Sequence, residues 1–475
     1  MATAEATMHE GEIRKLLNIE KLKHCFECGI CTASCSMAEL LGEDYNPRGL
    51  LEKIFLDVED ALSAHELWLC AWCYKCYRRC PQALEVPEIF LLVRTIAVKR
   101  GCLNPLGKAI QKVAQNIPLP LVVTLVCLHP ERAGLNIQDV LETIRNERSK
   151  LKAKRELKGG KFKVAVLGSG PAGLTVAYEL VRKSYHVTVF ESLPELGGML
   201  RKCIPEYRLP RDVLEDELHF LESLGVEFKV NVQVGKDLIF DNLWDEGYGA
   251  IFVGVGAHKS QKLDIEGANL EGVIHALDFL WQVKNSEVEI GKKVTVIGGG
   301  NVAIDAAKTA LKLGAENVTL FYRRSKAEMP ANPWEVKEAE ETGVKMEFLV
   351  APKKILGENG RVSAVEFVRM KLGELDESGR RKPLPIEGSE FVFKTDNVIL
   401  AIGETPDLEF LPKDIVLNED GTIWVNPITM ETSIRGVFAG GDVVTGPASV
   451  IEAICAGKRA ANSIDRYMKA VGDMC

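Results

Sequence analysis

Eight of the chain's thirteen cysteines stand in two runs with the same internal spacing. The runs are Cys25, Cys28, Cys31, Cys35 and then Cys70, Cys73, Cys76, Cys80. Three closely spaced thiolates followed by a fourth form the pattern in which each run holds one [4Fe–4S] cluster and gives its last thiolate to the other cluster. We therefore predict crossed ligation. The first cluster takes Cys25, Cys28, Cys31 and Cys80, and the second takes Cys70, Cys73, Cys76 and Cys35.

Zinc is the main alternative for these cysteines. Structural zinc sites generally pair two CxxC elements, so the third and fourth cysteines of each run would be surplus. The remaining cysteines carry no motif, and buried cysteines usually just pack. They are Cys102, Cys127, Cys203, Cys455 and Cys475. The segment Met1–Gly11 is polar and acidic, unlike an export signal, so we expect a protein of the reducing cytoplasm.

A glycine turn follows the apolar segment Val164–Leu167, at Gly168, Gly170 and Gly173. In this fingerprint the first glycine makes a tight turn, the second lets the backbone approach a pyrophosphate, and the third packs helix on strand. The next apolar run ends at Glu191, about 20 residues on, where an acid can bind a ribose hydroxyl. These features predict a parallel α/β domain that binds a dinucleotide.

A second fingerprint, at Gly298, Gly300 and Asn301, predicts a second dinucleotide. The apolar run that follows it ends in Arg323 and Arg324 where an acid would otherwise stand. Arginine can clamp the 2′-phosphate of NADP, so we expect NADP rather than NAD. The alternative is a solvated basic pair at a strand end.

From Lys161 onward the chain resembles the small subunits of NADPH-dependent glutamate synthases. The runs Leu196–Met199, Ile204–Pro210 and Glu328–Ala331 carry the resemblance. It implies a glutathione-reductase-like pair of dinucleotide domains, with the nicotinamide domain inserted in an FAD domain. Further FAD contacts are expected at Gly198, Arg208, Gly256, Gly441, Asp442, Ser449 and Val450. Asp442 would accept from the ribityl hydroxyls, and the helix that opens at Ser449 and Val450 would face the flavin.

Residues 20–100 resemble the two-cluster iron–sulfur subunit of heterodisulfide reductases. The resemblance rests on the two cysteine runs, the long spacer with Asn46-Pro47-Arg48, and the segment Leu67–Cys76. It implies a two-cluster relay that hands electrons to a separate subunit.

The expected domain order follows from these motifs. It is a mostly helical, ferredoxin-like two-cluster module (1–100), a helical linker (101–160), an FAD domain in two parts (161–283 and 396–475), and an NAD(P) domain between them (284–395). A formal net charge of −8 argues against nucleic acid as a partner. The most apolar run, Ile117–Leu128, is shorter than the ~20 residues of a membrane span, and we expect it in a core.

The expected function is electron transfer in a subunit of a larger redox complex. Hydride would pass between NAD(P)H and FAD, and single electrons between FAD and the clusters, so no side chain is needed as a catalytic acid, base or nucleophile. The partner would be a heterodisulfide-reductase-, hydrogenase- or dehydrogenase-like subunit, with or without bifurcation. Two alternatives are a glutamate synthase small subunit, against which the N-terminal module counts, and a non-catalytic redox sensor or scaffold, against which the intact glycines and cysteines count.

Overall fold

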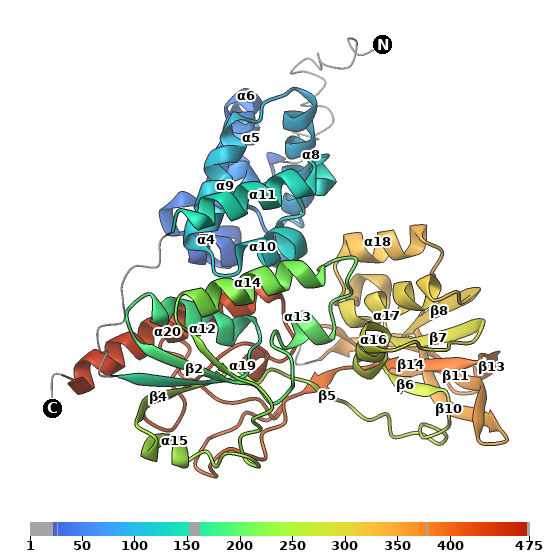
Figure 1. The fold of residues 1–475 in the computed structure, drawn as a ribbon. Helices are drawn as coiled ribbons and strands as arrows, with labels where there is room; N and C mark the ends of the chain where they lie inside the picture. The colour runs from blue at the N-terminus through green and yellow to red at the C-terminus, as the bar shows by residue number, and fades with distance from the viewer. Residues whose placement is uncertain (1–21, 26, 152–161, 377–378, 473–475) are drawn as a thin grey trace. The chain divides into compact units, whose positions relative to one another are not determined.

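The computed structural model describes residues 22–25, 27–151, 162–376 and 379–472 (Figure 1). It divides into two compact units. The first comprises Met1–Gly198, Arg208–Gly256 and Leu408–Cys475, and the second comprises Met199–Tyr207 and Ala257–Asp407.

A five-stranded parallel sheet forms the core of the flavoprotein part of the first unit. Its order is β16 (Val437–Ala439), β4 (Tyr248–Val253), β1 (Lys163–Leu167), β2 (His186–Phe190) and β3 (Glu227–Lys229). The central strand β1 is buried at four of its five residues, as its unbroken apolar sequence requires in a sheet covered on both faces. Helices α12 (Pro171–Val181) and α20 (Val450–Gly472) pack against each other beside it. The shorter helices of this part are α14 (Arg211–Ser223), α15 (Asn242–Asp245) and α19 (Asp442–Thr445).

From residue 22 to residue 151 the described chain forms helices and no strand (Figure 1). They are α3 (Ile30–Ala33), α4 (Ser36–Leu41), α5 (Pro47–Leu56), α6 (Val58–Leu62), α7 (Lys75–Arg79), α8 (Val86–Lys99), α9 (Asn104–Asn116), α10 (Pro120–Val123) and α11 (Ile137–Ser149). Local sequence starts several of them: Asn46 and Asp57 accept hydrogen bonds from backbone N–H groups of the first turns of α5 and α6. In the part of the chain that the structure describes, no helix has the length and apolar character needed to cross a bilayer.

The expectation of a linker over residues 101–160 is wrong for most of that range. Val113 of α9, together with Ile117 and Leu128, is buried in the same apolar core as the cysteine runs, because α9 is amphipathic and turns its apolar face inward. In α11, Arg148 forms an ion pair with the fully buried Glu217 of α14, whose carboxylate also accepts from Leu121 N at 2.7 Å. The expected glycine-containing link falls at residues 152–161, outside the described residues.

The second unit is built on another five-stranded parallel sheet. Its order is β6 (Val273–His275), β14 (Asn397–Ala401), β7 (Lys293–Gly298), β8 (Asn317–Tyr322) and β9 (Lys345–Phe348). An antiparallel sheet joins β10 (Val350–Glu358), β11 (Arg361–Leu375), β12 (Arg381–Pro385) and β13 (Phe391–Lys394). The helices are α13 (Met199–Lys202), α16 (Ala276–Asn285), α17 (Asn301–Lys312) and α18 (Pro333–Glu341), and a short pair joins β5 (Lys259–Ser260) to β15 (Glu404–Thr405).

The expected domain boundaries at 283/284 and 395/396 are therefore corrected. The second unit begins at Ala257 and ends at Asp407, apart from the short segment Met199–Tyr207. The physical reason is strand pairing. Strand β14 pairs with β6 on one side and with β7 on the other, so residues 397–401 complete the second sheet instead of returning to the first.

Candidate functional site

Three glycines shape the turn after β1. Two of them leave no room for a side chain, and the third borders open space. Gly168 has φ +96°, and a Cβ there would lie 2.6 Å from the Gly254 carbonyl oxygen. A Cβ on Gly173 would lie 2.0 Å from the Gly168 oxygen, so neither position admits a side chain. Gly170 differs, because a Cβ there would meet no atom within 4 Å. The N-terminus of α12 therefore faces open space bordered by backbone, which fits a pyrophosphate.

Glu191, at the end of β2, ties this turn to the following loop. It is 6% exposed, and its Oε2 accepts from Ser169 N at 3.0 Å and from Ser169 Oγ at 2.6 Å. Its Oε1 accepts from Leu193 N at 3.0 Å and from Ser192 Oγ at 3.2 Å. A carboxylate has about four acceptor positions, so Glu191 uses its capacity within the chain. Its contact with a ribose stays a prediction.

Ser169 is a residue that the sequence reasoning missed. Its hydroxyl donates to Glu191 and accepts from Gly197 N at 2.9 Å, and the side chain is 1% exposed. Its place between two fingerprint glycines was the available signal. Next to it, Gly198 has φ +54° and comes so near the turn that a Cβ would lie 2.9 Å from Gly170 Cα.

The residues near the C-terminus that are expected to contact FAD lie at the start of α20 and just before it. Gly441 has φ +79°, and a Cβ there would lie 3.0 Å from Ala172 Cβ in α12. Asp442 Oδ1 accepts from Ala448 N at 3.2 Å. Ser449 Oγ donates to Glu452 Oε2 at 2.7 Å, and Glu452 N donates back to Ser449 Oγ at 3.4 Å, which fixes the first turn of α20 beginning at Val450.

Two further expected FAD residues have different surroundings. Gly256 has φ +72° and open space at its Cβ position, so it also lets backbone approach a ligand. Arg208 is half-buried, and its charge acts on Cys127 and His129. Burial lowers the pKa of His129, and the positive charge of Arg208 lowers it further. Burial raises the pKa of the Cys127 thiol to about 12, so this cysteine is a buried neutral thiol.

The second fingerprint repeats the geometry of the first. Gly298 has φ +152°, and a Cβ would lie 2.1 Å from the carbonyl oxygen of Ala401 at the end of β14. Gly300 caps α17 and has no atom within 4 Å of its Cβ position. Asn301 Oδ1 accepts from Asn332 N at 3.0 Å, which holds the neighbouring loop over the helix start. As in the first fingerprint, one glycine leaves no room for a side chain and another borders open space, and this arrangement fits a second dinucleotide.

The two arginines after β8 do not share one role. Arg324 is 4% exposed; its Nη2 donates to Asp376 Oδ2 at 2.6 Å, and its Nε donates to Arg381 O at 2.8 Å. The guanidinium of Arg324 thus ties the end of β8 to the antiparallel sheet, whereas Arg323 is exposed. Contact of either arginine with a 2′-phosphate stays a prediction, and the exposed Arg323 is the freer of the two to make it.

The cysteine runs share a backbone conformation. In the first run Glu27 and Gly29 have φ of +52° and +73°, and at the matching positions of the second run Trp72 and Tyr74 have φ of +44° and +59°. Non-glycine residues rarely adopt this left-handed region unless a site requires it. Repeated entry into it forms the backbone concavities that hold anions and iron–sulfur clusters.

Cys80 of the second run lies with the first three cysteines. Cys25, Cys28, Cys31 and Cys80 line one small pocket. Arg48 and Pro81 also line it, and Cys28 is exposed to solvent. Burial raises the pKa of Cys31, and the neighbouring Cys25 and Cys28 raise it further.

Cys35 of the first run lies instead with the cysteines of the second. Burial, with smaller contributions from Cys70 and Cys73, raises the pKa of Cys35 to about 12. The pKa of Cys76 is raised by burial and then by Cys70, Cys73 and Cys35. These four thiols therefore lie near one another, and Cys31 of the first set is also near Cys76. Over the described residues no three Cys, His, Asp or Glu side chains form a ready-made metal site. Both sets have the donor chemistry of a [4Fe–4S] cluster, and the assignment of each cysteine to one cluster stays a prediction.

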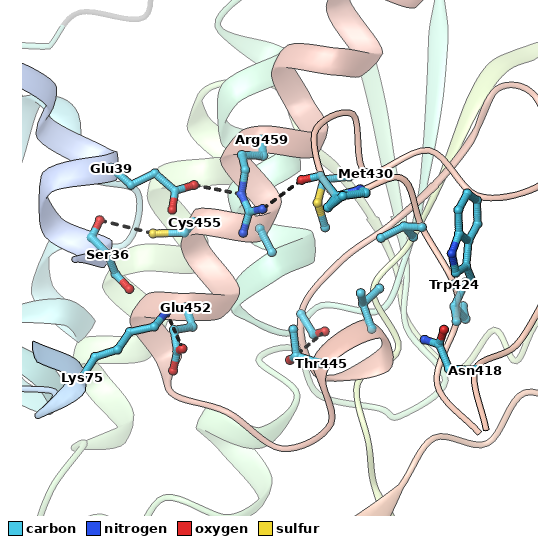
Figure 2. Close-up of a pocket in the computed structure, with 16 residues that line it drawn as sticks. Ser36, Glu39, Lys75, Asn418, Trp424, Met430, Thr445, Glu452, Cys455 and Arg459 are labelled. Carbon is cyan, nitrogen blue, oxygen red and sulfur yellow. Dashed lines mark hydrogen bonds and ion pairs between the residues drawn. The ribbon is translucent and has the colours of Figure 1, made fainter. Parts of the chain in front are cut away.

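Helix α20 contacts residues that stand next to cysteines of the second set (Figure 2). Lys75, between Cys73 and Cys76, forms an ion pair with Glu452 Oε1 at 2.7 Å. The Cys455 thiol donates to the carbonyl oxygen of Ser36, which follows Cys35, at 3.3 Å. Burial opposes ionisation of Glu452, but hydrogen bonds from Lys75 and Ser449 hold its pKa below the ordinary value. The helix expected to face the flavin therefore also holds the segments that carry the second cysteine set.

Comparison with family models identifies both parts of the chain. Residues 162–457 match the pyridine nucleotide-disulphide oxidoreductase model. Residues 21–84 match a 4Fe-4S dicluster domain, which confirms the cluster interpretation over zinc.

Curated relatives extend these matches. The chain is 39% identical over 431 residues to the β subunit of the NADP(+)-dependent formate dehydrogenase of Moorella thermoacetica, covering 83% of this chain and 60% of that protein. It is 36% identical over 440 residues to the β subunit of the NADPH-Fe(3+) oxidoreductase of Geobacter sulfurreducens, covering 83% and 63%. It is 38% identical over 327 residues to the glutamate synthase [NADPH] small chain of Escherichia coli, covering 65% and 69%. The chain therefore spans less than two thirds of the first two relatives.

Solved structures share the fold of the flavoprotein part. FprA of Mycobacterium tuberculosis, determined in complex with NADPH, aligns with a TM-score of 0.56 at 19% identity, over 66% of this chain and 85% of FprA. The thioredoxin reductase of T. acidophilum aligns with a TM-score of 0.51 at 21% identity, over 65% and 99%. The expected two-dinucleotide α/β fold is thereby confirmed.

The crossed ligation predicts which cluster each cysteine serves. Replacing Cys80 with Ser in the anaerobically reconstituted chain should lower iron from about eight to about four atoms per chain and remove the first cluster's EPR signal. The matched control is Cys102→Ser, outside both runs, which should keep all the iron. Loss of the second cluster's signal in the Cys80 variant would show that the runs are not crossed.

The open position of Gly170 predicts a variant that folds without FAD. In Gly170→Val the new side chain meets no protein atom at its Cβ position, but it occupies the space that fits the pyrophosphate. Flavin absorbance should fall to near zero while iron content stays at the wild-type value. Retention of stoichiometric flavin would place the pyrophosphate elsewhere.

Proposed function

This chain belongs to the pyridine nucleotide-disulphide oxidoreductase family, and we propose that it relays electrons between NADPH, FAD, two [4Fe–4S] clusters and a partner subunit. It is an NAD(P)H-dependent oxidoreductase with an iron–sulfur module at its N-terminal side. We assign the dinucleotide contacts and the eight cysteine ligands to the residues described above.

The contact between α20 and the second cysteine set carries the proposal. The first turn of α20 is held by Ser449 and Glu452, and the same Glu452 carboxylate binds Lys75 between two of the cysteines. The first turn of α20 therefore joins the predicted flavin site to a residue of the second cysteine run. This supports the order FAD, second cluster, first cluster.

In this scheme the chain's own residues bind the cofactors and hold them in position. The bound cofactors supply hydride transfer and one-electron transfer. The two glycine turns hold the dinucleotides at helix N-termini, and the second cysteine set lies against the apolar core with Cys70 buried in it. No side chain has to act as acid, base or nucleophile. Thiolate ligation requires a reducing compartment, and we propose the cytoplasm.

The first cluster site is the proposed exit. Cys28 is exposed, and the adjacent Ile30 is 39% exposed, whereas Cys70 of the second set is buried. A partner that exchanges electrons with the chain would therefore dock at residues 27–31. The two relatives named as β subunits support a partner in a larger complex. Similarity to the glutamate synthase small chain covers only 65% of the chain, and this favours a redox complex over glutamate synthase itself.

A Cys73→Ser variant tests the order of the relay. It should reduce FAD with NADPH at the wild-type rate in stopped flow, because the dinucleotide sites are intact. It should lose most of the reduction of the co-purified partner, because the second cluster loses one of its four thiolate ligands. The opposite variant, Gly170→Val, should lose both reactions. Slow FAD reduction in the Cys73 variant would contradict a linear relay.

The exposure of Arg323 predicts nucleotide preference. A charge-assisted hydrogen bond contributes about 1.5–3 kcal/mol, so Arg323→Ala should raise the KM for NADPH by roughly tenfold or more. The KM for NADH should stay nearly unchanged. The matched control is Lys326→Ala, since Lys326 is exposed and paired with Glu340 at 2.8 Å. Equal effects of Arg323→Ala on both nucleotides would make Arg323 a solvated residue without that role.

A further inference from the structure

Arg94, in α8, is a buried cation beside the second cysteine set. Its side chain is 3% exposed. Its Nε donates to Leu67 O at 2.7 Å, its Nη2 to Cys70 O at 2.8 Å, and its Nη1 to Leu128 O at 3.0 Å. The guanidinium is thus held rigidly by three backbone carbonyls, one of which belongs to a proposed cluster ligand.

These carbonyls satisfy the donors of Arg94 but do not balance its charge. Over the described ranges, the groups that act electrostatically on Arg94 are Cys70 and Tyr45, and no carboxylate pairs with it. A buried charge without a partner is costly, so buried arginines are normally paired with an anion. The missing anion has to come from the cysteine site itself.

Tyr45 adds a second donor on the same cysteine. It is 2% exposed, and its hydroxyl lies within hydrogen-bond distance of the Cys70 side chain. A tyrosine hydroxyl is ordinarily protonated at neutral pH and has one hydrogen to donate, so Tyr45 can act as a donor to the sulfur.

The first cysteine set has a different basic residue. Arg48 lines its pocket, but the side chain is 35% exposed. Its Nη1 lies 3.7 Å from Glu27 and 3.9 Å from Glu52, so solvent and two carboxylates moderate its charge. A rigid, unbalanced cation is therefore a feature of the second set.

We propose that Arg94 and Tyr45 raise the reduction potential of the second cluster, Arg94 as its buried counter-charge and Tyr45 as a hydrogen-bond donor to the Cys70 sulfur. The inference rests on the proposed ligand set Cys35, Cys70, Cys73 and Cys76. A cluster bound by four thiolates is anionic and gains one negative charge when it takes one electron from the flavin. A fixed cation and a sulfur hydrogen bond favour that reduced form, since net charge and hydrogen bonds to sulfur set cluster potentials. Arg94 is then a positioning residue that acts through Cys70.

The test is an EPR-monitored redox titration of the anaerobically reconstituted full chain. Arg94→Gln keeps a donor but removes the charge, and it should lower the second cluster's reduction equilibrium constant about tenfold, or ~59 mV for one electron. Arg94→Lys keeps the charge and should restore most of the potential. Tyr45→Phe should shift the potential in the same direction by less. The first cluster should keep its potential in all three variants.

The controls separate this inference from the ligand assignment. Cys73→Ser should remove one EPR signal, which identifies it as that of the second cluster. If neither signal is lost, the assignment of Cys73 as a cluster ligand is wrong, and this result does not contradict the effect of Arg94 on the potential. Arg48→Gln should leave the second cluster's potential unchanged. If Arg94→Gln does not retain the second cluster, Arg94→Lys and Tyr45→Phe decide the question. Unchanged potentials in every variant that keeps eight irons, or equal shifts in Arg94→Gln and Arg94→Lys, would overturn the proposal and leave Arg94 a structural tie.

Discussion

Helix α20 packs against α12 with one face and against the iron–sulfur module with the other, and the first unit depends on both contacts. On one face Gly457 allows close packing, since a Cβ there would lie 2.5 Å from the Ala172 carbonyl oxygen of α12. On the other face Glu452, Cys455 and Arg459 recur at helical spacing and bind Lys75, Ser36 and Glu39 of the iron–sulfur module. A helix pressed this closely on α12 cannot shift without breaking the second set of contacts. Within the first unit, packing of α20 thus joins the flavoprotein sheet to the iron–sulfur module.

Each kind of predicted cofactor site occurs twice, and both copies have the same local backbone conformation. Gly168 and Gly298 occupy equivalent turns, each pressed against the carbonyl oxygen at the end of a neighbouring strand. The two cysteine runs likewise repeat their left-handed residues at matching positions. Repetition makes the sites alike in backbone, and differences in their surroundings then separate their roles. Arg94 is buried and balanced by no carboxylate in the described chain, whereas Arg48 is partly exposed between two of them.

The sequence was sufficient for features whose cause is local. Cysteine spacing and glycine fingerprints predicted the cofactor classes and the two-dinucleotide fold, because each depends on residues close together in the chain. The sequence was insufficient for features that depend on contacts between segments far apart in the chain. The second sheet recruits β14 from beyond the expected boundary, and Asp376 turns Arg324 inward although Arg323 and Arg324 look equivalent in sequence. Tyr45 and Arg94 carry no motif and meet at Cys70 only in the folded chain.

The first unit is assembled from three separate stretches of chain, and its closing helix α20 is made last of the described elements. During synthesis the cysteine runs emerge hundreds of residues before Glu452 and Cys455 exist. Until then the contacts of Lys75 and Ser36 with α20 cannot form. The second cysteine set therefore takes its final surroundings only when the flavin domain is completed.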